Sequence, residues 1–328
     1  MPEQFRKYAV RIGTEFDVKL HGLKARLFDG CGFGSKKATR KFLEWAEDYN
    51  PDLLWLHNIH GYYINIELLF NWIKSRPQMK VNWHLHDCWA FTGHCTYFSM
   101  VGCDKWKKQC NNCPQKKEYP VSFLLDRSEY NYEIKKKLFS NVNNMLLITP
   151  SKWLADLTRN SFLKNYPVEV RYNTIDTSIF KPTKSDFREK NGLEEKIIIL
   201  GVASVWEKRK GLEDFCKLAT MLDDRFIIVL VGLSKRQIDM LPENIIGIKR
   251  TESPQELAAI YTASDVFVNP SKEETFGMTT LEASNCGLKV IVYEGTACGE
   301  IAVANGGSVV RQGAENIYNA ITKQFAKS

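Results

Sequence analysis

Short apolar runs alternate with amphipathic segments through the second half of this chain, and this alternation constrains the fold more than any other feature. Residues 196–203 form a nearly continuous apolar run, as a parallel strand covered on both faces does, and residues 212–222 follow with helical spacing. Such a pattern is typical of a doubly wound α/β sheet, whose ligand binds beyond the carboxyl ends of the strands. Further strands are predicted at 226–231, 245–248, 266–268 and 289–293, and further helices at 254–263, 277–285 and 315–325.

The first half of the chain repeats the alternation less regularly. A chain of 328 residues is long enough for two domains with separate cores, and the polar segment 181–195 is the best candidate for a linker. We therefore expect an N-terminal domain over residues 1–180, with a long cysteine-rich excursion at 88–120, and a C-terminal domain over residues 196–328. In the first half, strands are predicted at 53–57, 80–85, 145–149 and 168–172, and helices at 64–73 and 152–162.

Two glutamates, Glu274 and Glu282, stand eight residues apart around the predicted helix at 277–285. Glu274 falls in the loop before the helix and Glu282 inside it, so the free N–H groups of the helix start lie between the two carboxylates. Carboxylates that accept from hydroxyls, on either side of a helix start that attracts anions, suit a sugar nucleotide with its diphosphate. The alternative is a pair of surface glutamates on an amphipathic helix.

The charge of the chain is uneven. The formal net charge is +7, and residues 1–180 hold 26 Lys and Arg against 18 Asp and Glu, whereas residues 181–328 hold 19 against 20. The basic first half suits nucleic acid, anionic lipid headgroups or a phosphorylated substrate, while a merely solvated basic face accounts for any single cluster. The sequence shows neither a signal peptide nor a run of about 18 apolar residues, and we expect a cytoplasmic protein.

Four of the nine cysteines are clustered between residues 95 and 113, in the excursion at 88–120. Cys95, Cys103, Cys110 and Cys113 have the spacing C-x7-C-x6-C-x2-C, and thiolates spaced in this way can close a tetrahedral zinc site that staples a loop. His94 is a further candidate ligand. We predict structural zinc on the four thiols, with free thiols as the first alternative and a disulfide pair as the second.

Four segments, taken in their order along the chain, resemble the retaining glycosyltransferases of family 4, which have the GT-B fold of two Rossmann-like domains that face a cleft. The resemblance extends over about residues 50–311, and its last segment is specific to such enzymes. The stretch from His86 to Pro120 is similar to the subgroup that builds capsular, colanic-acid-type and other bacterial exopolysaccharides. The four segments are Pro150-Ser151-Lys152-Trp153-Leu154, Tyr172-Asn173-Thr174-Ile175-Asp176-Thr177-Ser178-Ile179-Phe180, Gly201-Val202-Ala203-Ser204 with Lys208-Arg209-Lys210-Gly211, and residues 274–282 with Ala283-Ser284-Asn285-Cys286-Gly287.

The resemblance assigns roles to individual residues of the second half. Glu274 would bind hydroxyls of the donor sugar, Glu282 would accept from the ribose hydroxyls of the nucleotide, and Lys210 would neutralise the leaving diphosphate. Departure of a nucleoside diphosphate develops negative charge that a fixed cation stabilises. The backbone of Phe276 and Gly277 would face the donor sugar and the diphosphate. The implied donor site also includes Ser204, Arg209, Met278 and Thr279.

The match departs from the family beside Lys210. The family has an arginine about five residues before this lysine, whereas Val205 stands here, so Arg209 or Lys208 would have to substitute. In the first half, His86 matches the histidine that family members place near the reacting sugar, where imidazole could donate to a sugar hydroxyl or position the acceptor. A strand-end histidine with a structural hydrogen bond is the alternative. The predicted catalytic set is His86, Arg209, Lys210 and Glu274.

Two expected motifs are missing from the sequence. No Asp-x-Asp occurs, so we expect transfer without a catalytic metal ion, with protein cations and the helix start in its place. The strand and glycine-rich loop that open other family members do not precede Asp52, and residues 30–34 read as a loop without a strand before it. We therefore expect a chain shortened at its N-terminus and at its C-terminal helix, in which donor binding survives.

These features predict a retaining glycosyltransferase that moves a sugar from a UDP-, GDP- or ADP-sugar to a saccharide or an undecaprenyl-diphosphate-linked saccharide. The mechanism that the resemblance implies is front-face departure and attack, with the donor phosphate taking the acceptor proton. The basic first half suits a peripheral contact with the inner face of the membrane. The alternatives are a sugar-nucleotide-binding protein without turnover and a zinc-containing nucleic-acid-binding protein; we expect no nucleic-acid partner.

Overall fold

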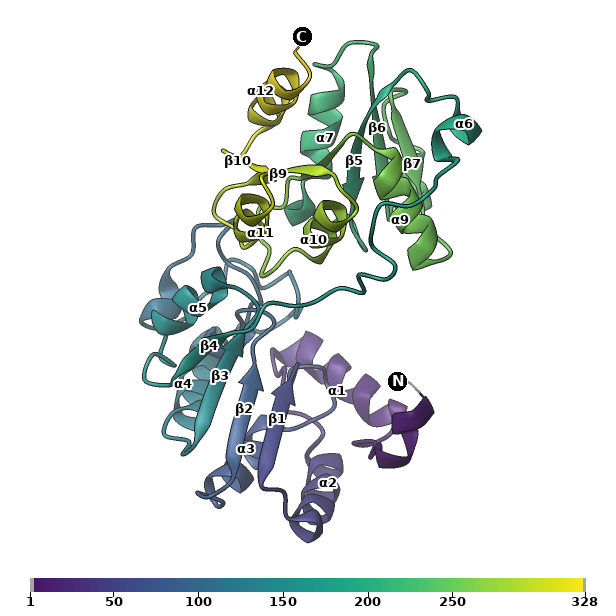
Figure 1. Cartoon of the computed structure of the whole chain (residues 1–328). Helices are drawn as coiled ribbons and strands as arrows, with labels where there is room; N and C mark the ends of the chain where they lie inside the picture. The colour runs from purple at the N-terminus through teal and green to yellow at the C-terminus, as the bar shows by residue number, and fades with distance from the viewer. Residues whose placement is uncertain (1–2, 327–328) are drawn as a thin grey trace. The chain divides into compact units, whose positions relative to one another are not determined.

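The computed structural model describes residues 3–326, in two compact units of which the first ends at Arg171 and the second begins at Tyr172 (Figure 1). Both units are built on parallel sheets with helices, which confirms the predicted α/β fold class. The segment 181–195, predicted as a linker, lies in the second unit, where Arg188 donates to the backbone oxygen of Ala263 at 2.7 Å. No helix among the described residues is both long enough and apolar enough to cross a membrane.

The first unit is built on four strands. Its elements are η1 (Glu3–Tyr8), α1 (Glu15–Phe28), α2 (Lys36–Tyr49), β1 (Leu53–His57), α3 (Ile66–Lys74), β2 (Lys80–His84), η2 (Trp89–Phe91), η3 (Lys105–Lys107), α4 (Ser128–Phe139), β3 (Met145–Thr149), α5 (Lys152–Arg159) and β4 (Val168–Val170). The strand order is β1-β2-β3-β4, with every neighbouring pair parallel. Helices α2, α3 and α4 pack side by side, and α3 and α4 lie behind the sheet in Figure 1.

Local sequence signals start several helices of the first unit. Thr14 forms a capping box at α1, because Asp17 N donates to Thr14 Oγ1 at 3.2 Å and Thr14 N donates to Asp17 Oδ2 at 2.8 Å. Asn65 and Ser151 cap α3 and α5 by accepting from a backbone N–H three residues further on. Helices α1, α2 and α4 lie outside the predicted helices.

The connection from β2 to α4 spans residues 85–127 and contains only the short 3₁₀ helices η2 and η3. Its shape comes from buried aromatic side chains: the rings of Phe98 and Trp106 stack at a centroid distance of 4.8 Å, and Phe91 packs against Trp106 at 5.5 Å. The predicted cysteine-rich excursion is therefore a packed loop with an apolar core of its own.

The second unit is built on six strands. Its elements are α6 (Phe187–Asn191), β5 (Ile197–Val202), η4 (Lys208–Lys210), α7 (Leu212–Ala219), β6 (Phe226–Val231), α8 (Lys235–Ile238), β7 (Ile245–Ile248), α9 (Pro254–Ala263), β8 (Val266–Asn269), α10 (Met278–Asn285), β9 (Lys289–Tyr293), α11 (Cys298–Ala304), β10 (Ser308–Val310) and α12 (Ala314–Gln324). The strand order is β10-β9-β8-β5-β6-β7, and all neighbouring pairs are parallel.

The strand order of the second unit reverses between β5 and β8. The chain moves outward from β5 to β6 and β7, then returns through α9 to β8 on the other side of β5 and continues outward to β9 and β10. Helix α12 packs against α7, whereas α10 packs against α9 and α11, so the sheet is doubly wound (Figure 1). In open parallel sheets, ligands bind beyond the carboxyl ends of the strands at such a switch point.

Candidate functional site

The predicted donor residues of the second unit lie mainly on the two loops at this switch point. Lys272 N, in the loop after β8, donates to Arg209 O, in the loop after β5, at 2.8 Å. Gly211 has a φ of +76°, and a Cβ atom there would lie 2.5 Å from Pro270 O, so glycine is required for the loops to meet. The loops carry Ser204, Arg209, Lys210, Glu274, Phe276 and Gly277.

Lys210 and Glu274 form an ion pair between the two loops, from Nζ to Oε2. Their side chains are only 18% and 15% exposed, so water and salt screen the pair less than a surface pair. Arg209 donates to Glu207 Oε2 at 3.0 Å and to Glu273 O at 3.2 Å. The structure thus brings Lys210 to a carboxylate predicted to bind the sugar, while Arg209 ties one loop to the other.

Gly277 ends the second loop and precedes α10. Its φ is +99°, and a Cβ atom would lie 2.6 Å from the Sγ atom of the buried Cys298, so both backbone conformation and space require glycine. Phe276 is buried beside it, with its ring centroid 6.2 Å from that of Tyr172. These contacts fix the direction in which α10 begins.

The first turn of α10 contains the backbone N–H groups that are predicted from the sequence to bind the diphosphate. Met278 and Thr279 are its first two residues, and N–H groups at this position of a helix attract anions. Thr280 Oγ1 accepts from Asn269 Nδ2 at 2.9 Å, which holds this turn against the end of β8. The helix start is therefore anchored to the sheet at the switch point.

Glu282 lies further along α10, where its Oε2 atom accepts from Tyr261 Oη of α9 at 3.0 Å. Tyr261 is fully buried, and its hydroxyl also lies 3.3 Å from Thr279 O. Burial raises the pKa of Glu282 above its usual value, and the hydrogen bond from Tyr261 opposes part of that rise. Sequence reasoning missed Tyr261, which reads as one more apolar position of the helix predicted at 254–263.

A pocket of about 660 Å³ is lined by three of the predicted donor residues, Ser204, Thr279 and Glu282. Lys249 and Arg250, which were not predicted from the sequence, line it as well. Their place directly after β7 was the available signal, because all carboxyl ends of a parallel sheet lie at one edge. The pocket has the size of a site for a small organic ligand.

His86 belongs to the first unit, where it follows β2; the predicted donor residues belong to the second. Its Nε2 atom is hydrogen-bonded with His57 Nδ1 at 2.9 Å. The His57 ring also stacks on His84 at a centroid distance of 4.5 Å. Burial, and then the neighbouring His57, lower the pKa of His86, which favours neutral imidazole.

A second polar pair follows the same strands. Asp87 Oδ1 accepts from Trp89 N at 2.8 Å, and its Oδ2 atom lies 3.2 Å from His60 Nε2. Burial raises the pKa of Asp87 to about 6 and lowers the pKa of His60 to about 3. Sequence reasoning missed His60, although it stands three residues after β1 as Asp87 stands three after β2.

The four predicted zinc ligands lie in the connection between β2 and α4. All are free thiols; Cys95 and Cys110 are buried, and Cys103 and Cys113 are half-buried. They line one small cavity of about 10 Å³. Within residues 3–326, no three His, Cys, Asp or Glu side chains stand in positions that would hold a metal ion. The fold therefore gathers the thiols without arranging them as a finished ligand set.

Comparison with known protein sequences identifies glycosyltransferases. The family described as Glycosyl transferases group 1 matches residues 183–327. WcaC of Escherichia coli (strain K12), named as a glycosyl transferase of colanic acid biosynthesis, is 23% identical over 295 residues, which cover 88% of this chain and 70% of WcaC. The N,N'-diacetylbacillosaminyl-diphospho-undecaprenol alpha-1,3-N-acetylgalactosaminyltransferase of Campylobacter jejuni is 30% identical over 128 residues, which cover 37% of this chain and 33% of that enzyme.

Solved structures of similar fold cover both units of the chain. Sucrose-phosphate synthase from Thermosynechococcus elongatus aligns with a TM-score of 0.64 at 19% identity, covering 89% of this chain and 69% of that one. HepE of Anabaena, solved in complex with UDP, aligns with a TM-score of 0.64 at 16% identity, covering 88% of this chain and 72% of that one. At such identities the similarity shows the fold, and it confirms the predicted GT-B architecture.

Proposed function

We propose that the chain is a group 1 glycosyltransferase that transfers a sugar, with retention of configuration, from a nucleotide-sugar donor to a saccharide or an undecaprenyl-diphosphate-linked saccharide. One observation carries the proposal. At the switch point of the second unit, the Lys210–Glu274 ion pair and the Glu282–Tyr261 hydrogen bond place two carboxylates and a cation around the start of α10. A hydroxyl-rich ligand with a central diphosphate has complementary groups.

Donor binding is the task of the second unit in this proposal. Glu282, oriented by Tyr261, accepts from the ribose hydroxyls, and the pocket of about 660 Å³ that it lines has room for the nucleoside. HepE was solved with UDP and with UDP-glucose. UDP-sugars are therefore the first donors to test, before GDP- and ADP-sugars.

The leaving diphosphate occupies the space between Lys210 and the start of α10. Both supply positive charge where the departing group develops negative charge, so they stabilise the transition state more than the ground state. Glu274 accepts from hydroxyls of the donor sugar and gives up part of its ion pair with Lys210 when the diphosphate binds. In this arrangement protein groups take the place of a divalent ion.

The acceptor is the task of the first unit. We assign His86 to a sugar hydroxyl near the reacting carbon, with His57 fixing the orientation of its ring through the hydrogen bond at 2.9 Å. The acceptor oxygen attacks from the face that the diphosphate leaves, and a phosphate oxygen of the donor takes its proton.

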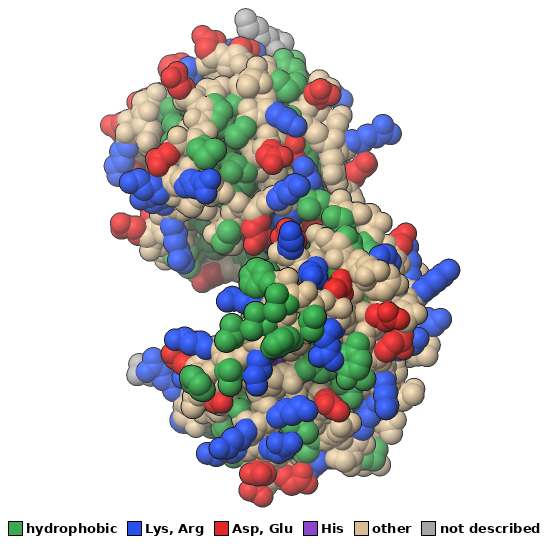
Figure 2. Space-filling view, turned by 180° about the vertical axis from the view of Figure 1, so that it is seen from behind, with side chains coloured by type: hydrophobic (Ala, Val, Ile, Leu, Met, Phe, Trp, Pro, Cys, Tyr) green, Lys and Arg blue, Asp and Glu red, His purple; other side chains and the backbone are tan. Residues whose placement is uncertain are grey.

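A peripheral contact with an anionic membrane accounts for an apolar patch on the first unit. The patch comprises the exposed side chains of Phe16, Leu20 and Leu23 on one face of α1 and those of Phe123 and Leu124. The segment of Phe123 and Leu124 lies against the end of α1, because Phe123 N donates to the backbone oxygen of residue 26 at 2.6 Å. Figure 2 shows apolar side chains gathered on the first unit with Lys and Arg side chains around them.

Basic side chains complete the patch. Lys19, Lys24 and Arg26 are exposed on α1, and Lys117 is exposed near the Phe123 segment. Apolar side chains that enter the headgroup region, with cations placed for anionic lipids, are the usual pattern of interfacial binding. Such a contact would bring the protein to a lipid-linked acceptor at the inner face of the membrane.

The experiment that tests the function combines donor binding with turnover. We expect one class of UDP-, GDP- or ADP-sugar to raise the melting temperature of the purified chain and to release its nucleoside diphosphate when a lipid-linked saccharide is supplied. Lys210→Ala should lower the rate of release by about 10²- to 10³-fold, the usual effect of removing one group that stabilises developing charge.

The matched control is Lys217→Ala, which removes an exposed lysine from α7 and should leave the rate unchanged. A chain that none of these donors stabilises would contradict the proposed donor site. Donor binding without release, across all acceptors, would favour a sugar-nucleotide-binding protein without turnover.

A further inference from the structure

The cysteine-rich connection between β2 and α4 gathers four thiols around one cavity that the transfer reaction does not use. Cys95, Cys103, Cys110 and Cys113 all line it, and its volume of about 10 Å³ is room for a single water-sized or ion-sized body. We propose that this cavity is a structural zinc site, with the four thiols as thiolate ligands. The proposal goes beyond the glycosyltransferase function and does not depend on it.

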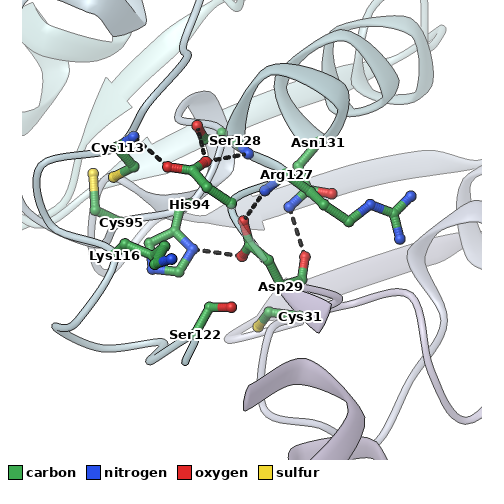
Figure 3. Close-up of polar contacts among 12 residues, drawn as sticks. Asp29, Cys31, His94, Cys95, Cys113, Lys116, Ser122, Arg127, Ser128 and Asn131 are labelled. Carbon is green, nitrogen blue, oxygen red and sulfur yellow. Dashed lines mark hydrogen bonds and ion pairs between the residues drawn. The ribbon is translucent and has the colours of Figure 1, made fainter. Parts of the chain in front are cut away.

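Cys95 and Cys113 already stand together at the cavity. Their side chains are in contact, and Figure 3 shows the two sulfur atoms side by side. Cys113 is held by its backbone, because its N–H donates to Asp126 Oδ2 at 2.6 Å and Asp126 Oδ1 in turn accepts from Ser128 N at 2.9 Å at the start of α4. Through Asp126, Cys113 and the Cys95 side chain that contacts it are held at the start of α4.

Cys110 approaches from another part of the loop. Its Sγ atom accepts from Gly93 N at 3.2 Å, and amide N–H groups directed at sulfur are a common outer shell of thiolates bound to zinc. A Cβ atom on Gly93 would lie 1.9 Å from Ser128 O and 2.8 Å from Cys110 Cβ, so only glycine allows this approach. The backbone is therefore built to bring the Cys110 thiol inward.

A buried cation lies next to the thiols. Lys135 of α4 is only 1% exposed, and its Nζ atom donates to Trp89 O at 2.8 Å and Thr92 O at 3.0 Å. Cys110 and Cys95 are among the groups that interact with its charge. Asp29 also interacts with this cation. A zinc ion with four thiolates has a net charge of −2, and a neighbouring ammonium group offsets part of it.

A buried nitrogen at the same cavity also lacks a partner. His94 lines the cavity, and its Nδ1 atom is hydrogen-bonded with Asp29 Oδ1 at 2.5 Å (Figure 3). Its Nε2 atom has no hydrogen-bond partner among the described residues. An orphaned polar atom in a buried site indicates an occupant, since leaving it unpaired costs free energy that a bound ion or water removes.

The thiols must still close around the ion, because no three metal-binding side chains among the described residues stand in finished ligand positions. Cysteine side chains change rotamer about one bond, and all four already border the cavity, so we expect closure by side-chain rotation. Once formed, the site would tie Cys95 to residues 103–113 and staple a loop that has only two short 3₁₀ helices.

The test is the metal content of the purified chain, prepared under reducing conditions with zinc in the medium. Elemental mass spectrometry should find one zinc per chain, and Cys110→Ser and Cys113→Ser should each lose most of it. Cys216→Ser is the matched control, because this half-buried thiol belongs to α7 of the second unit, and it should keep the full zinc content.

Cobalt substitution reports the ligands without relying on activity or stability. Replacing zinc by Co²⁺ should give the sulfur-to-cobalt charge-transfer band and the intense d–d bands of a tetrahedral thiolate site, and both should weaken in the Cys110→Ser variant. Absence of zinc together with absence of the charge-transfer band would overturn the proposal. So would a Cys95–Cys113 disulfide found by peptide mapping of the freshly prepared protein.

Discussion

At the scale of single residues, the second unit gives three charged side chains of the proposed donor site defined partners. Glu282 accepts from Tyr261, and Lys210 is paired with Glu274. Side chains held in this way lose little conformational entropy when a ligand binds, so more of the interaction energy appears as affinity. The orientation of Glu282 therefore depends on a buried residue of a different helix.

Glu282→Ala should weaken the binding of all nucleotide sugars and of the free nucleoside diphosphate to a similar extent, because they share the ribose. The loss of hydrogen bonds to a carboxylate corresponds to roughly 10- to 100-fold in dissociation constant, or about 1.5–3 kcal/mol. Tyr261→Phe should show a smaller loss in the same direction. Isothermal titration calorimetry with the donor and with the nucleotide alone measures both.

Glu294→Ala is the control for Glu282→Ala, because Glu294 is an exposed glutamate that directly follows β9. It should bind every ligand as the parent does. A Glu282→Ala variant with unchanged affinity for the nucleotide would show that the ribose is held elsewhere.

At the scale of elements, the position of α10 depends on the glycine before it. Gly277 needs its positive φ, and the Sγ atom of Cys298 leaves no room for a Cβ atom. In the proposed function the first turn of α10 supplies N–H groups for the diphosphate, so a shift of this helix start should change both stability and anion binding.

Gly277→Ala should destabilise the protein by about 2–4 kcal/mol, from the left-handed backbone and from overpacking against Cys298. Gly306→Ala is the matched control, because Gly306 has a φ of +68° and no atom within 4 Å of an added Cβ. This variant should lose only the stability that the left-handed backbone costs, about 1–2 kcal/mol. Urea unfolding measures both, and donor titration should show weaker binding for Gly277→Ala alone. Equal losses of stability in the two variants would mean that the Cys298 side chain moves aside without a cost in free energy.

At the scale of the whole molecule, charge and apolar surface are distributed unevenly along the chain. The excess of Lys and Arg lies in residues 1–180, and the patch formed by Phe16, Leu20, Leu23, Phe123 and Leu124 lies in the same half. Exposed apolar side chains beside basic residues are the pattern that the proposed membrane contact requires.

Phe123→Ser combined with Leu124→Ser should reduce binding to vesicles of phosphatidylglycerol and phosphatidylcholine by roughly tenfold or more, because each side chain loses apolar burial. Binding of the parent chain should weaken with salt and with removal of the anionic lipid, as electrostatic attraction does. Met240→Ser, at an apolar side chain that is 73% exposed in the second unit, should bind like the parent. Vesicle flotation measures all of these, and equal flotation of the double variant would exclude the patch as the contact.

The alternation of apolar and amphipathic segments determined the fold class and most strands. β1, β3, β6, β7 and β9 have the predicted bounds, since a buried parallel strand is a short apolar run that needs no distant information. The glutamate pair and Lys210 could be singled out from local motifs at strand ends, and their roles in donor binding stay a prediction. The four cysteines were likewise visible from their spacing.

Only the tertiary structure decided how these residues meet. The strand order placed the loops after β5 and β8 together, so Lys210 pairs with a glutamate far along the chain. Tyr261, Lys249 and Arg250 join the proposed donor site through packing and through the shared edge of the sheet, neither of which a residue type or a spacing encodes. The sequence by itself determined the chemistry that is available, and the topology determined which side chains act together, because contacts across a parallel sheet join segments that are distant in the chain.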